Sequence, residues 1–262
     1  MTTMTRIRSL AVLLAAAALT GCEQDAVQID DITAPATGAW VKFFNFGVGA
    51  PQVNFYAGDR KVTAVSSTTG AESTVGVAYG GAAAGGVYTA IPAGQVTFAG
   101  RISATVDNNL PIAAIPGTLV EGKAYSVYLS GSYDAAAKRS DGFVVEDNLP
   151  AAFDDTQALV RLVNASHNSP AVQLAVRNAT TLAETPVGGE VAYKAAGAFV
   201  GVPSGGYDLV VRTAGTATPL VIRTAVAFSV GRIYTITLRG DATLPSTGTS
   251  ANRPILDNTL NR

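Results

Sequence analysis

The chain contains little cysteine, histidine or charge. Its 262 residues include one cysteine, one histidine and 14% charged residues, where a typical soluble domain has about 25% charged residues. One cysteine excludes a disulfide within the chain, and one histidine excludes a metal site with two histidine ligands. The net charge of −1 lacks the basic character of nucleic-acid-binding domains, so we predict no nucleic-acid partner.

The N-terminus has the parts of a bacterial lipoprotein leader, in order. Arg6 and Arg8 supply positive charge, residues 10–19 form a short apolar run, and Leu19-Thr20-Gly21-Cys22 follows. The run is well below the roughly 20 residues that span a bilayer, which disfavours a permanent transmembrane helix. Its end resembles the lipobox, and this resemblance implies cleavage before Cys22 and a lipid on its sulfur that anchors the protein to the membrane. An ordinary signal peptide with an incidental cysteine is the alternative.

After a signal peptide of residues 1–21, residues 22–38 are predicted to form a flexible tether. They are acidic and polar, show no hydrophobic period and end in Ala34-Pro35-Ala36-Thr37-Gly38. Fully extended, the 16 residues from Glu23 to Gly38 reach about 50 Å at about 3.3 Å per residue. Glu23, following the lipidated cysteine, resembles the pattern that permits export to the outer membrane. We therefore expect a lipid-anchored protein of the cell envelope, in the outer membrane if the cell is Gram-negative.

A repeat organises the rest of the chain. Val41-Lys42-Phe43-Phe44-Asn45 returns as Val160-Arg161-Leu162-Val163-Asn164, at an offset of 119 residues. Further landmarks return in the same order: Val77-Ala78-Tyr79 as Val191-Ala192-Tyr193, Ile91-Pro92-Ala93-Gly94 as Val202-Pro203-Ser204-Gly205, Gly122-Lys123-Ala124-Tyr125 as Gly231-Arg232-Ile233-Tyr234, and Asp147-Asn148 as Asp257-Asn258. The preserved order predicts two copies of one domain, over residues 39–150 and 156–262, joined by a short linker.

Within each copy, short segments of alternating apolar and polar residues are separated by turns that carry Gly and Pro. In the first segment, Val41 and Phe43 are expected to face the core and Lys42 to face away from it. Tyr125 and Tyr234, at matching positions, are expected to lie in the two cores. The pattern predicts an all-β fold of two tandem β-sandwich domains, immunoglobulin-like or prealbumin-like, with no helix after the leader.

Several segments of the second copy form a recognisable set: Val160–Ser166 with Pro170-Ala171-Val172, the Pro203–Tyr207 corner, and Gly231–Thr235. Together they resemble the bacterial family called domain of unknown function 4397, which occurs in secreted proteins and lipoproteins, often in tandem. The first copy departs at Phe46-Gly47-Val48, where the family usually has Ala-Ser-Pro. The resemblance extends over nearly all of the mature chain. It implies a β-fold in the cell envelope and adds no catalytic residue.

The polar residues form no recognisable catalytic constellation. His167 lies beside Ser166, but neighbours in a strand or turn point apart, and a triad needs a third, orienting group. We therefore expect His167 to be a polar turn residue. Three acidic pairs could suggest the two carboxylates of a glycosidase: Asp30-Asp31, Glu146-Asp147 and Asp154-Asp155. Consecutive side chains do not face each other across a substrate, so these pairs are expected to be solvated charges.

No metal or cofactor site is predicted. A calcium site at Asp147, or at Asp107-Asn108, would lack the ligand spacing of an EF-hand. Gly80–Gly86 lacks the Lys-Ser/Thr of a phosphate-binding loop and is expected to be flexible. It ends a stretch over residues 66–86 that is expected to be a mobile loop, interrupted by a short strand at Val75–Tyr79.

Two sets of residues are candidates for structural or binding roles. Asn45 and Asn164 end matching segments and are expected to cap turns through their side-chain amides. Five aromatic residues could form sugar-stacking platforms, although most are expected to fill cores and edges: Trp40, Tyr56, Tyr88, Tyr133 and Tyr207. The favoured function is a non-catalytic envelope module that binds a protein or glycan partner, or acts as a spacer. A secreted hydrolase, for example a glycan-active one, is the alternative.

Overall fold

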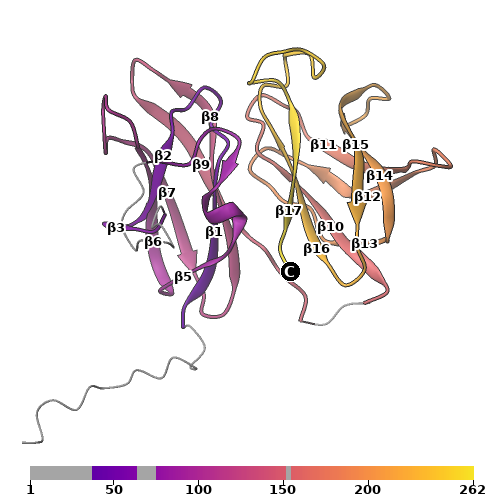
Figure 1. The fold of residues 1–262 in the computed structure, drawn as a ribbon, viewed down its shortest axis with the longest axis horizontal. Helices are drawn as coiled ribbons and strands as arrows, with labels where there is room; N and C mark the ends of the chain where they lie inside the picture. The colour runs from indigo at the N-terminus through magenta and orange to yellow at the C-terminus, as the bar shows by residue number, and fades with distance from the viewer. Residues whose placement is uncertain (1–36, 64–74, 152–154) are drawn as a thin grey trace, which may run out of the picture. The chain divides into compact units, whose positions relative to one another are not determined.

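The computed structural model describes residues 37–63, 75–151 and 155–262, which are almost entirely β-strands and turns (Figure 1). The short 3₁₀ segment η1 (Ala83–Gly86) is the only helical element among them. No helix in this part of the chain is long and apolar enough to span a bilayer. Residues 37–262 make one compact unit. The predicted signal peptide, Cys22 and nearly all of the tether lie outside the described residues.

The first half of the described chain forms a sandwich of two sheets. One sheet has the strand order β4-β1-β8-β9, with β5 also paired to β1, and the other has the order β3-β2-β6-β7. The strands are β1 (Ala39–Asn45), β2 (Val53–Ala57), β3 (Arg60–Lys61), β4 (Gly81–Ala82), β5 (Thr89–Ile91), β6 (Gly94–Ile102), β7 (Pro111–Leu119), β8 (Ala124–Asp134) and β9 (Arg139–Glu146). Val53, Phe55 and Phe98 are fully buried in the core of this sandwich.

The second half forms another sandwich with its own core. Its sheets have the orders β13-β10-β16-β17 and β12-β11-β14-β15. The strands are β10 (Gln157–Asn164), β11 (Val172–Asn178), β12 (Glu184–Val191), β13 (Val200–Pro203), β14 (Gly205–Thr213), β15 (Pro219–Phe228), β16 (Ile233–Arg239) and β17 (Ile255–Leu260). Leu162, Leu174 and Leu209 are buried in its core. The prediction of an all-β fold with two sandwich bodies is confirmed.

Each sandwich contains one parallel strand pair in an otherwise antiparallel sheet. β1 runs parallel to β8, with Val41 opposite Tyr125, and β10 runs parallel to β16, with Val160 opposite Tyr234. Tyr125 is buried, as expected from the sequence, whereas Tyr234 is only partly buried and packs against the core from its edge. The matching pairs give a residue-by-residue correspondence between the two sandwiches.

The outer face of β1, from which Lys42 points away from the core as predicted, is buried as well as its inner face. Val41 and Phe43 point into the core as expected, but Lys42 on the opposite face is only 1% exposed. The second sandwich covers this face: Phe44 and its neighbours form one apolar cluster with Val163 of β10. An alternating pattern shows which residues share a face of a strand, but it does not show what covers the second face.

The apolar part of this contact is dominated by aromatic rings from the first sandwich. The ring of Tyr128 is stacked on Phe44 and on Phe143, with centroid separations of 4.9 and 5.0 Å. Val163 and Ala165 of the second sandwich pack into the same cluster. Stacked rings of this kind add to the stabilisation from burial alone.

Strand pairing also corrects the predicted match between Asp147-Asn148 and Asp257-Asn258. Tyr125 on β8 pairs with Glu146, whereas Tyr234 on β16 pairs with Leu260. Since those tyrosines correspond, Leu260 takes the place of Glu146, and Asn261 takes the place of Asp147. The sequence match had paired two similar dipeptides that lie at different positions in the last strands.

The segment after β3 differs in part from the expected loop. Residues 64–74 lie outside the described part of the chain. The strand predicted at Val75–Tyr79 is reduced to one bridge, between Val77 and Val53. Gly80–Gly86 is not simply a loop, because it contains β4 and η1, and β4 pairs with the end of β1.

Candidate ligand-binding pocket

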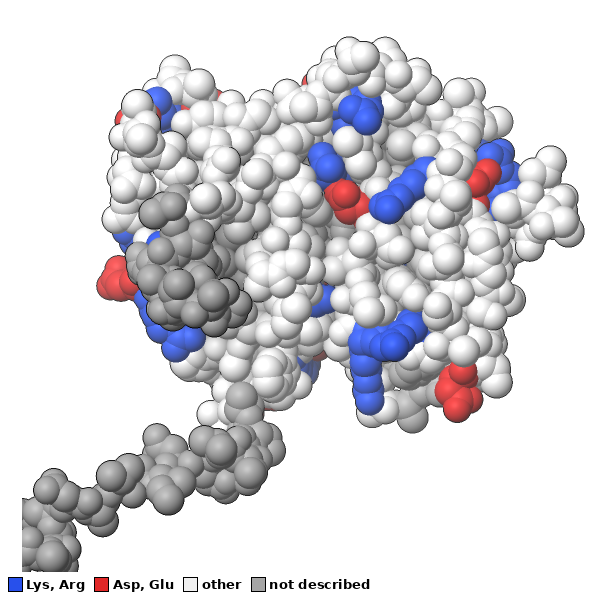
Figure 2. Space-filling model, viewed as in Figure 1, with Lys and Arg blue, Asp and Glu red and all other residues white. Residues whose placement is uncertain are grey.

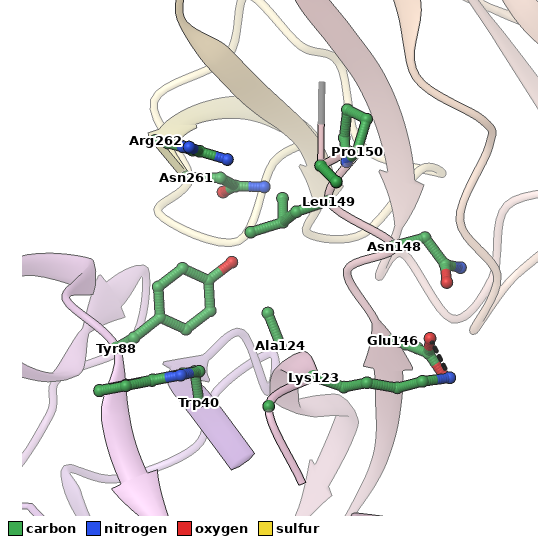
Figure 3. Close-up of a pocket in the computed structure, with 12 residues that line it drawn as sticks. Trp40, Tyr88, Lys123, Ala124, Glu146, Asn148, Leu149, Pro150, Asn261 and Arg262 are labelled. Carbon is green, nitrogen blue, oxygen red and sulfur yellow. Dashed lines mark hydrogen bonds and ion pairs between the residues drawn. The ribbon is translucent and has the colours of Figure 1, made fainter. Parts of the chain in front are cut away.

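A cleft of about 650 Å³ lies where the start of β1 meets the segment that follows β9 (Figure 3). Two aromatic side chains line it, Trp40 from β1 and Tyr88 from the residue before β5. Its other lining residues are Gly122, Lys123, Ala124, Glu146, Asn148, Leu149, Pro150, Ala151, Asn261 and Arg262. The volume lies within the roughly 300–1,000 Å³ of clefts that hold small ligands.

Strand pairing brings the two aromatic residues together, although 47 residues separate them in the sequence. β5 pairs with β1 so that Trp40 lies opposite Ala90. On its other side, Trp40 pairs with Ala124, and its N–H donates to the carbonyl of Lys123 at 2.8 Å. The backbone of Trp40 is therefore held between two strands while its side chain stays 36% exposed. Figure 3 shows it beside Tyr88 in the cleft.

Tyr88 is fixed by two contacts behind the cleft. Its hydroxyl donates to Oδ2 of Asp147 at 2.7 Å, and the ammonium nitrogen of Lys42 lies 4.2 Å from the centre of its ring. A cation over a ring face is attracted by the ring quadrupole. Burial, together with the carboxylate of Asp147, raises the pKa of Tyr88 well above its usual value, so the hydroxyl remains a donor.

Asp147 lies at the centre of a buried polar network. Its carboxylate is fully buried and forms an ion pair with Arg161 of β10, and it also accepts from the hydroxyl of Ser126 at 2.9 Å. Arg161 donates further to the carbonyl of Glu146 at 3.2 Å and to the hydroxyl of Thr235 at 3.0 Å. A buried charge is tolerated when it is paired and hydrogen-bonded, and these contacts meet that condition.

Lys42 is the second buried cation. Its Nζ donates to the carbonyl of Leu260 at 2.7 Å and to Oδ1 of Asn261 at 3.3 Å. Nδ2 of Asn261 donates in turn to the hydroxyl of Thr235 at 2.8 Å. Burial lowers the pKa of Lys42 to about 8; Asp147 raises it in part, and Arg161 lowers it further.

The contacts of Lys42 and Arg161 are reciprocal. Each basic residue lies at the same position of its sandwich and donates to the last strand of the other one. Lys42 reaches Leu260 and Asn261, and Arg161 reaches Glu146 and Asp147, which the register shows to be the corresponding residues. Contacts that are exchanged in this way are characteristic of an interface with two-fold symmetry.

A second cleft, of about 530 Å³, occupies the corresponding place beside the second sandwich. By register, Leu159 stands where Trp40 stands, and Phe199 stands where Tyr88 stands. Arg161 lies over the Phe199 ring at 4.7 Å, as Lys42 lies over Tyr88. The two clefts share Glu146, Asn148 and Pro150 in their linings. At the corresponding positions, the first cleft has a tryptophan and a tyrosine where the second has a leucine and a phenylalanine.

The sequence profile described as "Domain of unknown function (DUF4397)" matches residues 39–175, which is more than half of the chain. The chain belongs to the DUF4397 family. The matched residues contain the whole first sandwich, including the departure at Phe46-Gly47-Val48, and they reach into β11. The cleft at Trp40 and Tyr88 thus lies largely within the DUF4397 match.

A likeness to a solved structure is much weaker. A "putative cell adhesion protein" from Bacteroides ovatus ATCC 8483 is 9% identical, and the alignment covers 86% of this chain and 97% of that one, with a TM-score of 0.22. A TM-score this low does not indicate a common fold. No curated protein matches the chain.

Of the predicted acidic pairs in this DUF4397 chain, Asp155 is exposed as expected, whereas Asp147 is not. Asp147 is fully buried and ion-paired, so its prediction as a solvated charge is wrong. Glu146 is partly exposed and pairs with Lys123 at 2.8 Å (Figure 3). Asp107 pairs with Lys138 at 2.7 Å. Among the residues that the structure describes, no group of three or more His, Cys, Asp or Glu could hold a metal ion. Asp30-Asp31 and Asp154 lie outside those residues.

Ser166 and His167 do not form a nucleophile and base. Ser166 is buried, and its hydroxyl donates to the carbonyl of Gly240 at 2.8 Å. His167 lies in a turn, as predicted, but it is half-buried. The only proton of the serine hydroxyl is therefore donated to the backbone of this DUF4397 chain and not to His167.

Asn164 caps a turn as predicted, because its Oδ1 accepts from the N–H of Ser166 at 3.0 Å. Asn45 instead donates from Nδ2 to the carbonyl of Pro51 at 3.0 Å. The two asparagines share one further contact. Nδ2 of Asn45 donates to the carbonyl of Val77 at 2.9 Å, and Nδ2 of Asn164 donates to the carbonyl of Val191 at 3.2 Å. Val77 and Val191 were already matched in the sequence. These paired contacts give both asparagines a structural role in the DUF4397 fold.

Of the five aromatic candidates, only Trp40 and Tyr88 share a cleft. Tyr56 is covered by the Arg101 guanidinium at 4.5 Å, Tyr133 packs against the first core, and Tyr207 is buried with its hydroxyl donating to Pro203. The sequence analysis assigned no role in the site to Lys42 or Arg161. Both residues could have been found from one pattern in the sequence, which is a basic residue at the same place in both copies, inside an otherwise apolar segment.

Proposed function

We propose that this protein is a non-catalytic, lipid-anchored module of the cell envelope that binds its partner in the cleft at Trp40 and Tyr88. The observation that carries the proposal is the fixed position of Tyr88, held by Asp147 and Lys42, next to the exposed ring of Trp40. Binding sites gain affinity when their aromatic side chains are already rigid in the free protein.

The proposal includes a second DUF4397 copy in the second sandwich. Its support is the common strand order, the matching parallel pairs and the repeated asparagine contacts. We place the two copies at residues 39–150 and 156–262. The first copy then carries the ligand, and the second supplies Arg161 and Asn261 to hold the cleft together.

The location rests on the sequence. A signal peptide of residues 1–21, a lipid on Cys22 and a tether of residues 22–38 would attach the first sandwich to a membrane, in a Gram-negative cell the outer membrane. Mass spectrometry of the mature protein tests this part. A diacylated N-terminal peptide starting at Cys22 is expected, and an unmodified peptide running through Cys22 contradicts it.

Binding is favoured over hydrolysis by the carboxylates near the cleft. A glycoside hydrolase needs two carboxyl groups that face the scissile bond. The described lining has one carboxylate side chain, Glu146, which is paired with Lys123, while Asp147 lies behind it and is paired with Arg161. A secreted hydrolase with another site remains the second candidate.

Photo-crosslinking in intact cells tests the proposed function without assuming a ligand. A photoreactive residue replaces Lys123 at the rim of the cleft, and in a matched control it replaces Asp59, an exposed residue of the β2–β3 turn. We expect an adduct from position 123 that is absent at position 59 and is lost when Trp40→Ala is added. No adduct at position 123, or the same adducts at both positions, would contradict the proposal.

A further inference from the structure

The chemistry of the cleft lining indicates a class of ligand. Its apolar part consists of aromatic ring faces and short aliphatic side chains, chiefly Trp40, Tyr88 and Leu149 (Figure 3). Because Trp40 is more than one-third exposed in the free protein, its ring offers a flat apolar surface to a ligand. A ligand that matches this surface must itself have a flat apolar face.

The polar part of the lining can both donate and accept hydrogen bonds. Asn148 and Asn261 each carry an amide, and Glu146 and Lys123 form an ion pair with one another. The amide of Asn261 already accepts from Lys42 and donates to Thr235, so one acceptor position and one donor position are left for a ligand. An amide has two donor positions on nitrogen and two acceptor positions on oxygen. Such groups suit a ligand with several hydroxyls, each of which donates and accepts.

The surroundings do not select strongly for charge. On the face drawn in Figure 2, charged side chains are few, and both signs occur. This agrees with a chain in which only 14% of residues are charged. The lining itself holds two basic side chains, Lys123 and Arg262, and one acidic side chain, Glu146, which is paired with Lys123. A polyphosphate would therefore meet one basic side chain of the lining, Arg262, outside this pair.

The second cleft supplies an internal comparison. It has the same position relative to its sandwich, yet Leu159 and Phe199 stand where the first cleft has Trp40 and Tyr88. Leucine has no flat ring face, and phenylalanine has no hydroxyl to hold it against a carboxylate. Of the two clefts, the first therefore combines a tryptophan with a tyrosine whose hydroxyl is held by a carboxylate.

We propose that the first cleft binds a saccharide, with the C–H face of one pyranose ring on Trp40 and its hydroxyls hydrogen-bonded to Asn261 and Glu146. The inference rests on the proposed binding function and adds the ligand class. A pyranose combines a flat face of C–H groups with a rim of hydroxyls, which matches the two parts of the lining. The cleft volume of about 650 Å³ has room for a ligand of disaccharide size.

The protein contains one tryptophan, and it is Trp40, so its fluorescence reports on this cleft alone. The full-length protein is titrated with a panel of disaccharides: cellobiose, chitobiose, lactose, maltose and a glucuronate-containing disaccharide. At least one is expected to shift the tryptophan emission to shorter wavelength in a saturable manner. If none does, the saccharide assignment is overturned.

Calorimetry with the best disaccharide locates the site. Trp40→Ala is expected to weaken binding about tenfold or more, because the stacking surface is lost. Leu159→Ala, at the corresponding position of the second sandwich, is the matched control and is expected to leave affinity unchanged. Equal losses in both variants, or unchanged binding in Trp40→Ala, would overturn the assignment.

The two proposals can fail separately. If no disaccharide binds while a photoreactive residue at position 123 still captures a partner, the ligand is not a saccharide and the binding function stands. If neither experiment shows binding at the cleft, both proposals are wrong.

Discussion

At the residue scale, the most consequential feature is that two cations and one carboxylate are buried together. Lys42 and Arg161 are 1% and 2% exposed, and Asp147 is fully buried between the two sandwiches. Burying charge is unfavourable unless partners compensate, and a network that is fully bonded specifies one arrangement of its members. These residues hold Tyr88 in place, so they connect the fold to the cleft.

Asp147→Asn should be strongly destabilising. It removes the anion that faces Arg161 and leaves a buried guanidinium without its counter-charge, which costs about 3–5 kcal/mol in the free energy of unfolding. Asp141→Asn is the control, because it breaks an exposed pair with Lys194 that contributes about 0–1 kcal/mol. Urea unfolding measures both. Equal, small losses would show that the buried pair does not hold the structure.

Lys42 should make stability depend on pH in the alkaline range. Its pKa falls from 10.5 in the unfolded chain to about 8 in the folded protein. Between these values the unfolded chain binds the proton that the folded protein has lost, so the free energy of unfolding rises with pH. Below pH 8, the full cost of the buried charge is present.

Lys42→Met is the variant that isolates this effect. It keeps most of the side-chain volume and removes the titrating group, so its stability should lack the rise between pH 8 and 10.5. Urea unfolding of both proteins across this range gives the difference directly. Parallel profiles for the two proteins would mean that Lys42 titrates near its ordinary pKa.

At the element scale, the corresponding ends of β1 and β10 allow a paired prediction. Nδ2 of Asn45 donates to two carbonyls, whereas Asn164 makes two donor contacts and also accepts from the N–H of Ser166 and the hydroxyl of Ser169. Leaving buried groups without partners costs about 1–3 kcal/mol for each group.

In Asn45→Ala, the carbonyl of Val77 keeps the N–H of Val53 as a donor, whereas that of Pro51 loses the donor from Asn45. The substitution should therefore lower the free energy of unfolding by about 1–3 kcal/mol, and Asn164→Ala should lower it by more. Chemical denaturation of the two variants checks the order. An equal effect, or a larger one at Asn45, would show that the accepted bonds of Asn164 contribute nothing.

The strands were largely predictable from the sequence, because alternation and turn residues are local signals. Val53 and Phe55 are buried, and the Pro-Gly corner before β6 lies where it was expected. The cleft was not predictable in the same way. Trp40 and Tyr88 meet only through the pairing of β5 with β1, and the period of β1 could not show that a second sandwich covers Lys42.

At the scale of the whole molecule, the two sandwiches should unfold together. The aromatic cluster around Tyr128 includes Val163 of the second sandwich, and both buried cations donate across the contact. Separating the sandwiches would expose these groups to water, so neither sandwich is expected to stay folded without the other. Calorimetry of residues 37–262 should show one thermal transition, and two resolved transitions would contradict this coupling.

The central claim is that the cleft at Trp40 is the binding site, and the indole N–H of this single tryptophan tests it most directly. Its one nuclear magnetic resonance signal is followed while ¹⁵N-labelled protein is titrated with solubilised glycan and protein fractions of the cell envelope. We predict that at least one fraction shifts the Trp40 indole signal in a saturable manner, together with the backbone signals of Lys123 and Asn148. A fraction that binds and shifts signals elsewhere, while the Trp40 indole signal stays in place, would contradict the account.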